Sequence, residues 1–140
     1  MIGAYTIALT ADAQSALARA ADLAIVPSTG AEVLAGSTRL KAGTAQKVAL
    51  NAISTAVMVR LGKVYDNLMV DVVANNRKLS GRALRLVVRL AQVNQARAEE
   101  LLTRAGGSVK IAVLMERHRV DAKQARVLLE RSDGMLRELL

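Results

Sequence analysis

Two short apolar segments near the start of the chain, with an alanine-rich segment between them, constrain the fold most strongly. Residues 5–10 are apolar and rich in β-formers, residues 12–21 are typical of a helix, and residues 23–26 form a second apolar run that ends at Pro27. A strand, a helix and a strand within so short a space predict a right-handed βαβ unit with two parallel strands. Neither strand alternates polar with apolar residues, so both are expected to lie inside a sheet that is covered on two faces.

Two parallel strands of this buried type do not form a stable sheet by themselves. The first strand begins close to Met1, so no earlier residue is expected to cover its edge. The pattern therefore predicts that further strands come either from an N-terminal half that this chain lacks or from a partner chain.

A long helix is predicted next, from Ser37 or Thr38 to about Leu61, because serine and threonine are favourable N-cap residues and Gly62 suits a C-cap. Residues 48–59 of this helix are apolar on nearly all sides, as expected of a helix buried inside a domain. This section is shorter than the ~20 residues that a membrane span requires, and polar residues interrupt it. We therefore expect a buried helix and no membrane partner.

The chain then becomes mostly helical. Residues 64–72 are expected to be irregular or to form a short helix, and the apolar residues of segment 79–91 follow the 3.6-residue period of a helix. This first region, residues 1–93, is predicted to be an α/β part-domain with a two-stranded parallel sheet.

Three shorter helices are predicted after it. The first covers residues 96–105 and ends at Gly106, the second runs from the N-cap Ser108 to about residue 118, and Asp121 caps the third in an approximate capping box with Gln124. Three helices in so few residues predict a compact bundle, similar to the ubiquitin-associated (UBA-like) type, over residues 94–140.

Composition excludes several kinds of chemistry. The chain has no cysteine, which rules out disulfide scaffolds, thiol catalysis and zinc–thiolate sites, and the absence of a signal peptide favours the cytoplasm. The net charge is +8, but the basic residues are spread along the chain. His118, the single histidine, is interpreted as a surface cation near a helix end, and no metal site is expected.

Arg82, Arg85 and Arg89 share one face of a predicted helix, opposite its apolar side. Such a face could follow a phosphate backbone, or it could simply be solvated. With only two aromatic residues in the chain and no recognised nucleic-acid motif, we favour the solvated face and expect no nucleic-acid partner.

Residues 32–47, Glu-Val-Leu-Ala-Gly-Ser-Thr-Arg-Leu-Lys-Ala-Gly-Thr-Ala-Gln-Lys, are too polar for a core and too specific for a linker. A helix that begins at Ser37 or Thr38 would offer free N–H groups and a positive dipole end to a phosphate, beside the charges of Arg39 and Lys41. Alternatively, one hydroxyl merely caps the helix. Glu32 could act as a base, bind sugar hydroxyls, or pair with Arg39 or Lys41 and order the loop. The glycine spacing is not that of a Walker A loop.

This segment resembles the signature of the N-acetylmuramic acid 6-phosphate etherases, which have the sugar isomerase (SIS) fold. The resemblance continues through residues 61–72, Leu-Gly-Lys-Val-Tyr-Asp-Asn-Leu-Met-Val-Asp-Val, although Asp66 stands where the family usually has a small residue such as glycine. It extends over nearly the whole chain but matches only the second half of the family's chain. The resemblance implies that residues 1–93 are the C-terminal part of a phosphosugar-binding SIS domain and that residues 94–140 are the family's small helical tail.

Members of the family cleave the D-lactyl ether of N-acetylmuramic acid 6-phosphate, without a cofactor, to give N-acetylglucosamine 6-phosphate and D-lactate during cell-wall recycling. Their acid/base glutamates and Ser/Gly-rich phosphate loop lie in the N-terminal half, and no segment here matches either. The resemblance therefore assigns no catalytic residue to this chain and predicts that it is inactive alone. The residues that carry over as substrate-binding or supporting contacts are Glu32, Ser37, Thr38, Arg39, Lys41 and Thr44.

The expected partners are a phosphorylated amino sugar and either a second copy in a homodimer or the missing N-terminal half. The alternative is a stand-alone helical module without enzymatic activity, which would dimerise or bind a partner through its long apolar helix.

Overall fold

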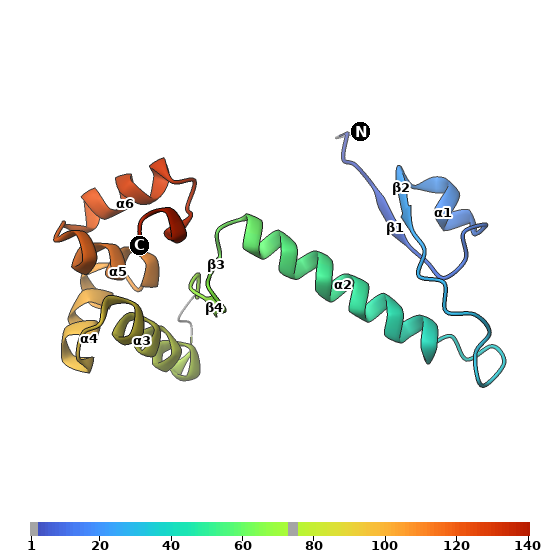
Figure 1. Ribbon diagram of the computed structural model, residues 1–140, viewed down its shortest axis with the longest axis horizontal. Helices are drawn as coiled ribbons and strands as arrows, with labels where there is room; N and C mark the ends of the chain where they lie inside the picture. Colours follow the sequence, from blue (N-terminus) through green and yellow to red (C-terminus); the bar gives the residue numbers. More distant parts are fainter. Residues whose placement is uncertain (1–2, 73–75) are drawn as a thin grey trace. The chain divides into compact units, whose positions relative to one another are not determined.

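The computed structural model describes residues 3–72 and 76–140 (Figure 1). Residues 1, 2 and 73–75, which fall inside the predicted first region, lie outside the described residues. The chain divides into two compact units, an N-terminal unit, Met1–Ala56, and a C-terminal unit, Val57–Leu140. Each unit is described by itself below.

The N-terminal unit begins with the predicted βαβ arrangement. Strand β1 (Ile7–Leu9) pairs in parallel with β2 (Leu23–Ile25), and the short helix α1 (Ala16–Ala20) connects them (Figure 1). The carboxylate of Asp22 accepts hydrogen bonds from the backbone N–H and the hydroxyl of Thr6, both at 2.7 Å. These bonds tie together the two chain segments that lead into the strands. The prediction of two parallel strands is confirmed.

The prediction that both strands are buried is wrong for the described chain. Ala8 is buried, but Ile7 is 54% exposed and Leu23 is 45% exposed. A parallel sheet is buried when helices cover both of its faces. Within the described part of this unit, α1 is the only helix that packs against the strand pair, and five residues are too few to cover it.

Helix α2 (Lys41–Arg60) begins later than predicted and ends as predicted. At its C-terminal end, Gly62 has a φ of +67°, its N–H donates to the carbonyl of Val59, and the N–H of Lys63 donates to the carbonyl of Met58. This is the Schellman arrangement, in which glycine takes the left-handed position.

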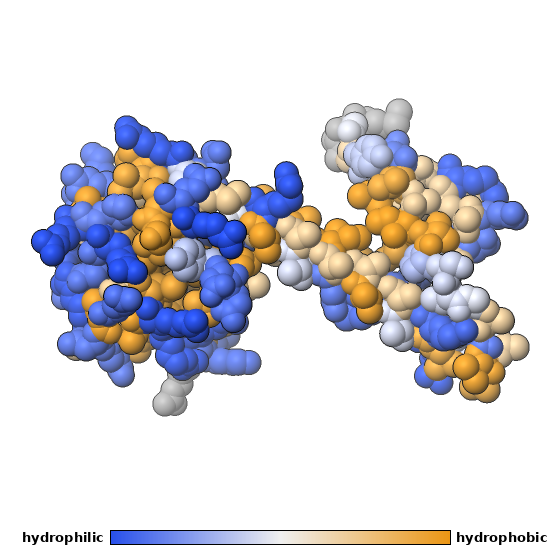
Figure 2. Space-filling model, viewed as in Figure 1, coloured by the Kyte–Doolittle hydropathy of each residue, from blue (hydrophilic) through white to orange (hydrophobic). Residues whose placement is uncertain are grey.

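The apolar side chains of α2 are exposed, contrary to the prediction of a buried helix. Ala42 is the only buried residue of α2, whereas Val48 is 63% exposed and Leu50 is 54% exposed. Figure 2 shows apolar surface along this helix. An apolar helix is buried only if other elements pack on all its sides, and within the described part of the N-terminal unit no strand or helix packs along α2.

A β-hairpin stands where an irregular segment or a short helix was predicted. Strands β3 (Val64–Tyr65) and β4 (Leu68–Met69) pair antiparallel around a two-residue turn. The first turn residue, Asp66, has a φ of +52°, a region that favours glycine but that aspartate tolerates. The prediction failed because the segment has no glycine to mark the turn.

The remaining described elements are four helices, as predicted from the sequence, and a final 3₁₀ turn. Their bounds are α3 (Arg77–Ala91), α4 (Gln95–Arg104), α5 (Val109–His118), α6 (Ala122–Arg131) and the 3₁₀ turn η1 (Leu136–Glu138). The predicted caps are present, since Ser108 accepts the N–H of Ile111, and Asp121 and Gln124 form a complete capping box. Helix α5 lies at the centre, with residues 109–115 all buried.

Helix α3 packs against α4 and α5, so the core of the C-terminal unit includes four helices rather than three (Figure 1). The resemblance of residues 94–140 to the ubiquitin-associated type is therefore not confirmed. The domain boundary between residues 93 and 94 stays a prediction. Among the described residues, no helix is long and apolar enough to cross a membrane.

Candidate functional site

The signature segment is organised by the carboxylate of Glu32. Its two oxygens accept the backbone N–H groups of Lys41 and Ala42, each at 2.9 Å. These hydrogen bonds, with the charge of Lys41 as a smaller contribution, lower the pKa of Glu32 from its ordinary value of 4.5. Glu32 thus caps α2 from nine residues upstream and closes the intervening residues into a loop.

The first turn of α2 has no free N–H group to offer a ligand. Glu32 takes those of Lys41 and Ala42, while the N–H of Gly43 donates to Thr38 and that of Thr44 donates to Leu40. The prediction that the helix starts at Ser37 or Thr38 is therefore wrong, and the N–H groups at the actual start of α2 are already bound within the chain. A carboxylate of the chain already occupies the position at which the helix would attract an anion.

The loop closed by Glu32 contains a β-turn. The N–H of Ser37 donates to the carbonyl of Leu34 at 3.0 Å, and Gly36, the third residue of the turn, has a φ of +79°. Glycine adopts this conformation without a steric penalty, which explains its place in the turn. The turn places Ser37, Thr38 and Arg39 consecutively before α2.

Four of the predicted residues keep polar groups that no neighbour uses. Among the described residues, the hydroxyls of Ser37 and Thr38 and the charged ends of Arg39 and Lys41 make no hydrogen bond or ion pair within the chain. Ser37 is half-buried and the other three are exposed. The four groups supply hydrogen-bond donors and two positive charges, a combination that suits phosphate.

Thr44 behaves differently from these four residues. Its hydroxyl donates to the carbonyl of Leu40 at 2.7 Å, across the first turn of α2. Like Glu32, it therefore supports the loop–helix junction. The structure brings all six predicted residues to one junction, but divides them into two supporting residues and four with unused polar groups.

The other residues considered from the sequence lie in the C-terminal unit. His118 is the last residue of α5, and its Nε2 lies 2.9 Å from the carbonyl oxygen of Leu139. Arg82, Arg85 and Arg89 lie on the exposed side of α3.

Among the described residues, no group of three or more histidine, aspartate or glutamate side chains could hold a metal ion.

Lys110 was not singled out from the sequence. It is only 7% exposed, and its ammonium donates to the carbonyl of Gly134 at 3.0 Å. Burial lowers the pKa of Lys110, and nearby Lys63 lowers it further, whereas Asp71 raises it. The sequence did not indicate that Lys110 is buried, because its burial depends on residues near the C-terminus that are distant in the chain.

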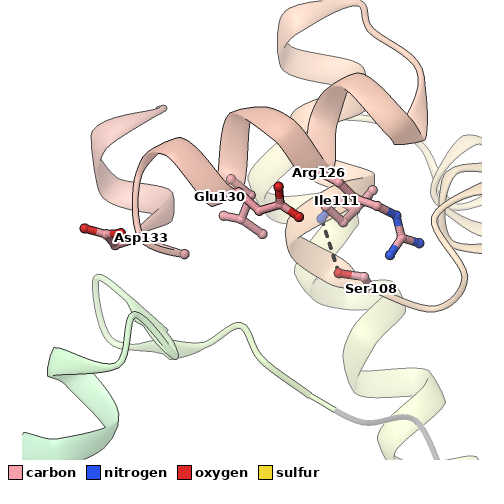
Figure 3. A pocket seen from close by; sticks show the side chains of 7 residues that line it. Ser108, Ile111, Arg126, Glu130 and Asp133 are labelled. Atoms are coloured by element: carbon pink, nitrogen blue, oxygen red, sulfur yellow. Dashed lines mark hydrogen bonds between the residues drawn. The ribbon is translucent and has the colours of Figure 1, made fainter.

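A pocket of about 490 Å³ lies in the C-terminal unit, between α5 and α6 (Figure 3). Its lining comprises Ser108, Ile111, Arg126, Leu129, Glu130, Asp133 and Gly134. None of the six residues predicted from the signature segment lines this pocket. Ser108, one of its polar lining residues, serves as the N-cap of α5.

Comparison with known proteins gives close relatives over nearly the full chain. An N-acetylmuramic acid 6-phosphate etherase of Rhizobium rhizogenes is 50% identical over 139 residues, which are 99% of this chain and 45% of that protein. An N-acetylmuramic acid 6-phosphate etherase 2 of Vibrio cholerae is 48% identical over 139 residues, again 99% of this chain and 45% of that protein.

An N-acetylmuramic acid 6-phosphate etherase of Symbiobacterium thermophilum is 55% identical over 113 residues, covering 81% of this chain and 38% of that protein. No protein-family model matches the chain. The chain thus spans a little under half the length of the curated relatives it matches. It belongs to the N-acetylmuramic acid 6-phosphate etherase family and corresponds to a C-terminal portion of these proteins.

Proposed function

We propose that this chain forms one wall of the phosphosugar site of an N-acetylmuramic acid 6-phosphate etherase, and that it binds the sugar phosphate without catalysing the reaction. The reaction of the whole enzyme would be cleavage of the D-lactyl ether to N-acetylglucosamine 6-phosphate and D-lactate. The observation that carries this proposal is 50% identity to an etherase over 99% of the chain. Identity over so much of the chain favours a part of an enzyme over a stand-alone interaction module.

The binding role is assigned to Ser37, Thr38, Arg39 and Lys41. Their hydroxyl and cationic groups lie within five consecutive positions, and no other described residue uses them. An arginine fork and neighbouring hydroxyls are suited to several phosphate oxygens at once. Phosphate supplies the strongest negative charge of the proposed ligand, so these groups would contact it.

The state of Glu32 supports binding without catalysis. Glu32, the only carboxylate in residues 32–47, has both oxygens engaged by backbone N–H groups, and its pKa is lowered. A general base works best when its pKa lies near the operating pH, and it must be able to reach a substrate proton. Glu32 meets neither condition in this arrangement.

The exposed apolar side chains of the N-terminal unit support a proposal about which elements cover them in the whole enzyme. Strands β1 and β2 and helix α2 present large apolar side chains to solvent, including Ile7, Leu23 and Val48. We assign the strands to an SIS-type parallel sheet in a cytoplasmic protein, completed by another part of the etherase or by a second copy in a dimer. Helices α4 to α6 would then form the family's UBA-like tail.

The test is D-lactate release from N-acetylmuramic acid 6-phosphate by the purified 140-residue chain, with a full-length relative as the positive control. Circular dichroism first establishes that the sample is helical. We expect no D-lactate above the enzyme-free background. Release at a rate comparable with the positive control would contradict the proposal and would place an acid/base group among these residues.

A further inference from the structure

The contacts of Glu32 leave the loop–helix junction with an unusual division of charge. The carboxylate lies across the N-terminal end of α2 and binds two N–H groups at 2.9 Å. The positive groups of Arg39 and Lys41 are exposed beside it, and neither forms an ion pair with Glu32 among the described residues. The carboxylate therefore neutralises the helix end and leaves both side-chain cations available.

A helix N-terminus attracts anions through its free N–H groups and its dipole. Without Glu32, the N–H groups of Lys41 and Ala42 would compete with the side chains of residues 37–39 for a phosphate. The same carboxylate also fixes the ends of the loop that carries these side chains, since it joins residue 32 to residues 41 and 42. One side chain thus determines both the shape of the loop and the place at which an anion can bind.

We propose that Glu32 is a positioning residue of the phosphosugar site: its carboxylate occupies the anion-binding end of α2 and directs the ligand's phosphate to Ser37, Thr38 and Arg39. This inference rests on the proposed function, in which those three residues and Lys41 bind phosphate. It assigns Glu32 a role other than that of a base, a partner of sugar hydroxyls or a partner of the Arg39 and Lys41 side chains.

The first experiment uses inorganic phosphate as the probe and the backbone amide signals of Lys41 and Ala42, in the ¹⁵N-labelled full chain, as the readout. In the unmodified chain these signals should not respond, because Glu32 holds both N–H groups. In Glu32→Ala they should shift saturably with phosphate concentration. Such a switch would not arise if Glu32 only stabilised the fold.

Two further variants make this experiment decisive. Glu32→Gln keeps the size of the side chain but has one acceptor oxygen in place of two, so its response should be intermediate even if Glu32→Ala folds poorly. Asp12→Ala is the matched control, because it removes a different carboxylate of the same unit, an exposed one that accepts the backbone N–H of Gln14. Equal phosphate responses in the unmodified chain and the Glu32 variants would overturn the proposal.

The second experiment uses N-acetylglucosamine 6-phosphate and the amide signals of Ser37, Thr38 and Arg39. These signals should respond in the unmodified chain, with an affinity about tenfold weaker in Glu32→Ala and unchanged in Asp12→Ala. Equal affinities with and without Glu32 would overturn the positioning role alone. No response in the unmodified chain would remove the proposed function and this role with it, while the inorganic phosphate titration would still report on the occupancy of the helix end.

Discussion

At the scale of single residues, two acidic side chains hold unusual local positions. Glu32 caps a helix that begins nine residues later, and Asp66 adopts a left-handed conformation in the turn of the β3–β4 hairpin. The first side chain is held by hydrogen bonds, whereas the second costs backbone strain. The two cases lead to opposite expectations for substitution.

Replacing Asp66 by glycine should stabilise the C-terminal unit. A left-handed φ costs a non-glycine residue roughly 1–2 kcal/mol. Glycine avoids this strain, but it loses more conformational entropy on folding, so only part of the strain energy is gained as stability. We therefore expect Asp66→Gly to raise the free energy of unfolding by about 0.5–1 kcal/mol, and Asp66→Ala to lower it by a similar amount. Urea denaturation of the three proteins measures both changes. The turn geometry would be contradicted if the two variants changed stability in the same direction.

The ionisation of Glu32 should be visible at acidic pH. Its pKa in the folded chain lies below the ordinary 4.5, since two backbone N–H groups stabilise the charged form. The carboxylate's contribution to stability is therefore fully present above about pH 4.5 and is lost as the pH falls through the folded pKa. The amide shifts of Lys41 and Ala42 should titrate with a midpoint below 4.5 and should not titrate in Glu32→Gln. A midpoint at or above 4.5 would refute the double hydrogen bond.

At the scale of elements, the sequence correctly predicted the helix ends that depend on residues close together in the chain. The Ser108 cap, the Asp121–Gln124 capping box and the Gly62 C-cap were predicted correctly, because each depends on residues within one or two turns. The start of α2 was misplaced because its cap, Glu32, is distant in sequence. The β3–β4 hairpin was missed because aspartate replaced the glycine that normally marks such a turn.

The capping box of α6 allows a direct test at this scale. Asp121 accepts the N–H of Gln124 at 2.8 Å, and the Gln124 side chain accepts the N–H of Asp121 at 3.1 Å. Because Asp121→Ala leaves these groups to water, it should lower the free energy of unfolding by about 1 kcal/mol. The exposed Lys123 of the same helix provides the control, and Lys123→Ala should change stability by less than about 0.5 kcal/mol. Equal effects in denaturant unfolding would show that the box does not stabilise α6.

At the scale of the whole molecule, the two units differ in how far they bury their apolar residues. The C-terminal unit has a continuous core built around α5, whereas α2 and the β1–β2 pair leave most of their large apolar side chains exposed. The sequence predicted that two parallel strands need further strands, and this prediction agrees with the exposure of β1 and β2. It wrongly predicted that α2 is buried. An apolar sequence shows that a helix would be stabilised by packing, but it does not show whether another element is present to pack against it.

The site shows the same limit of prediction. The sequence placed six residues in one segment, and the structure places all six at the junction with α2. The sequence could not separate supporting residues from available ones, because that distinction depends on hydrogen bonds across the loop. Glu32 and Thr44 proved to be bound internally, and this finding moves the proposed phosphate contact from the helix end to the side chains before it.

The most direct measurement is a calorimetric titration of N-acetylmuramic acid 6-phosphate into the folded 140-residue chain, compared with two variants. Arg39→Ala removes an exposed, unpaired cation of the proposed site, and Lys47→Ala removes an exposed cation of the same unit further along α2. We predict saturable binding by the unmodified chain, at least about tenfold weaker binding by Arg39→Ala, and unchanged binding by Lys47→Ala. No binding by the folded chain, or equal losses in the two variants, would contradict a phosphosugar site at this junction.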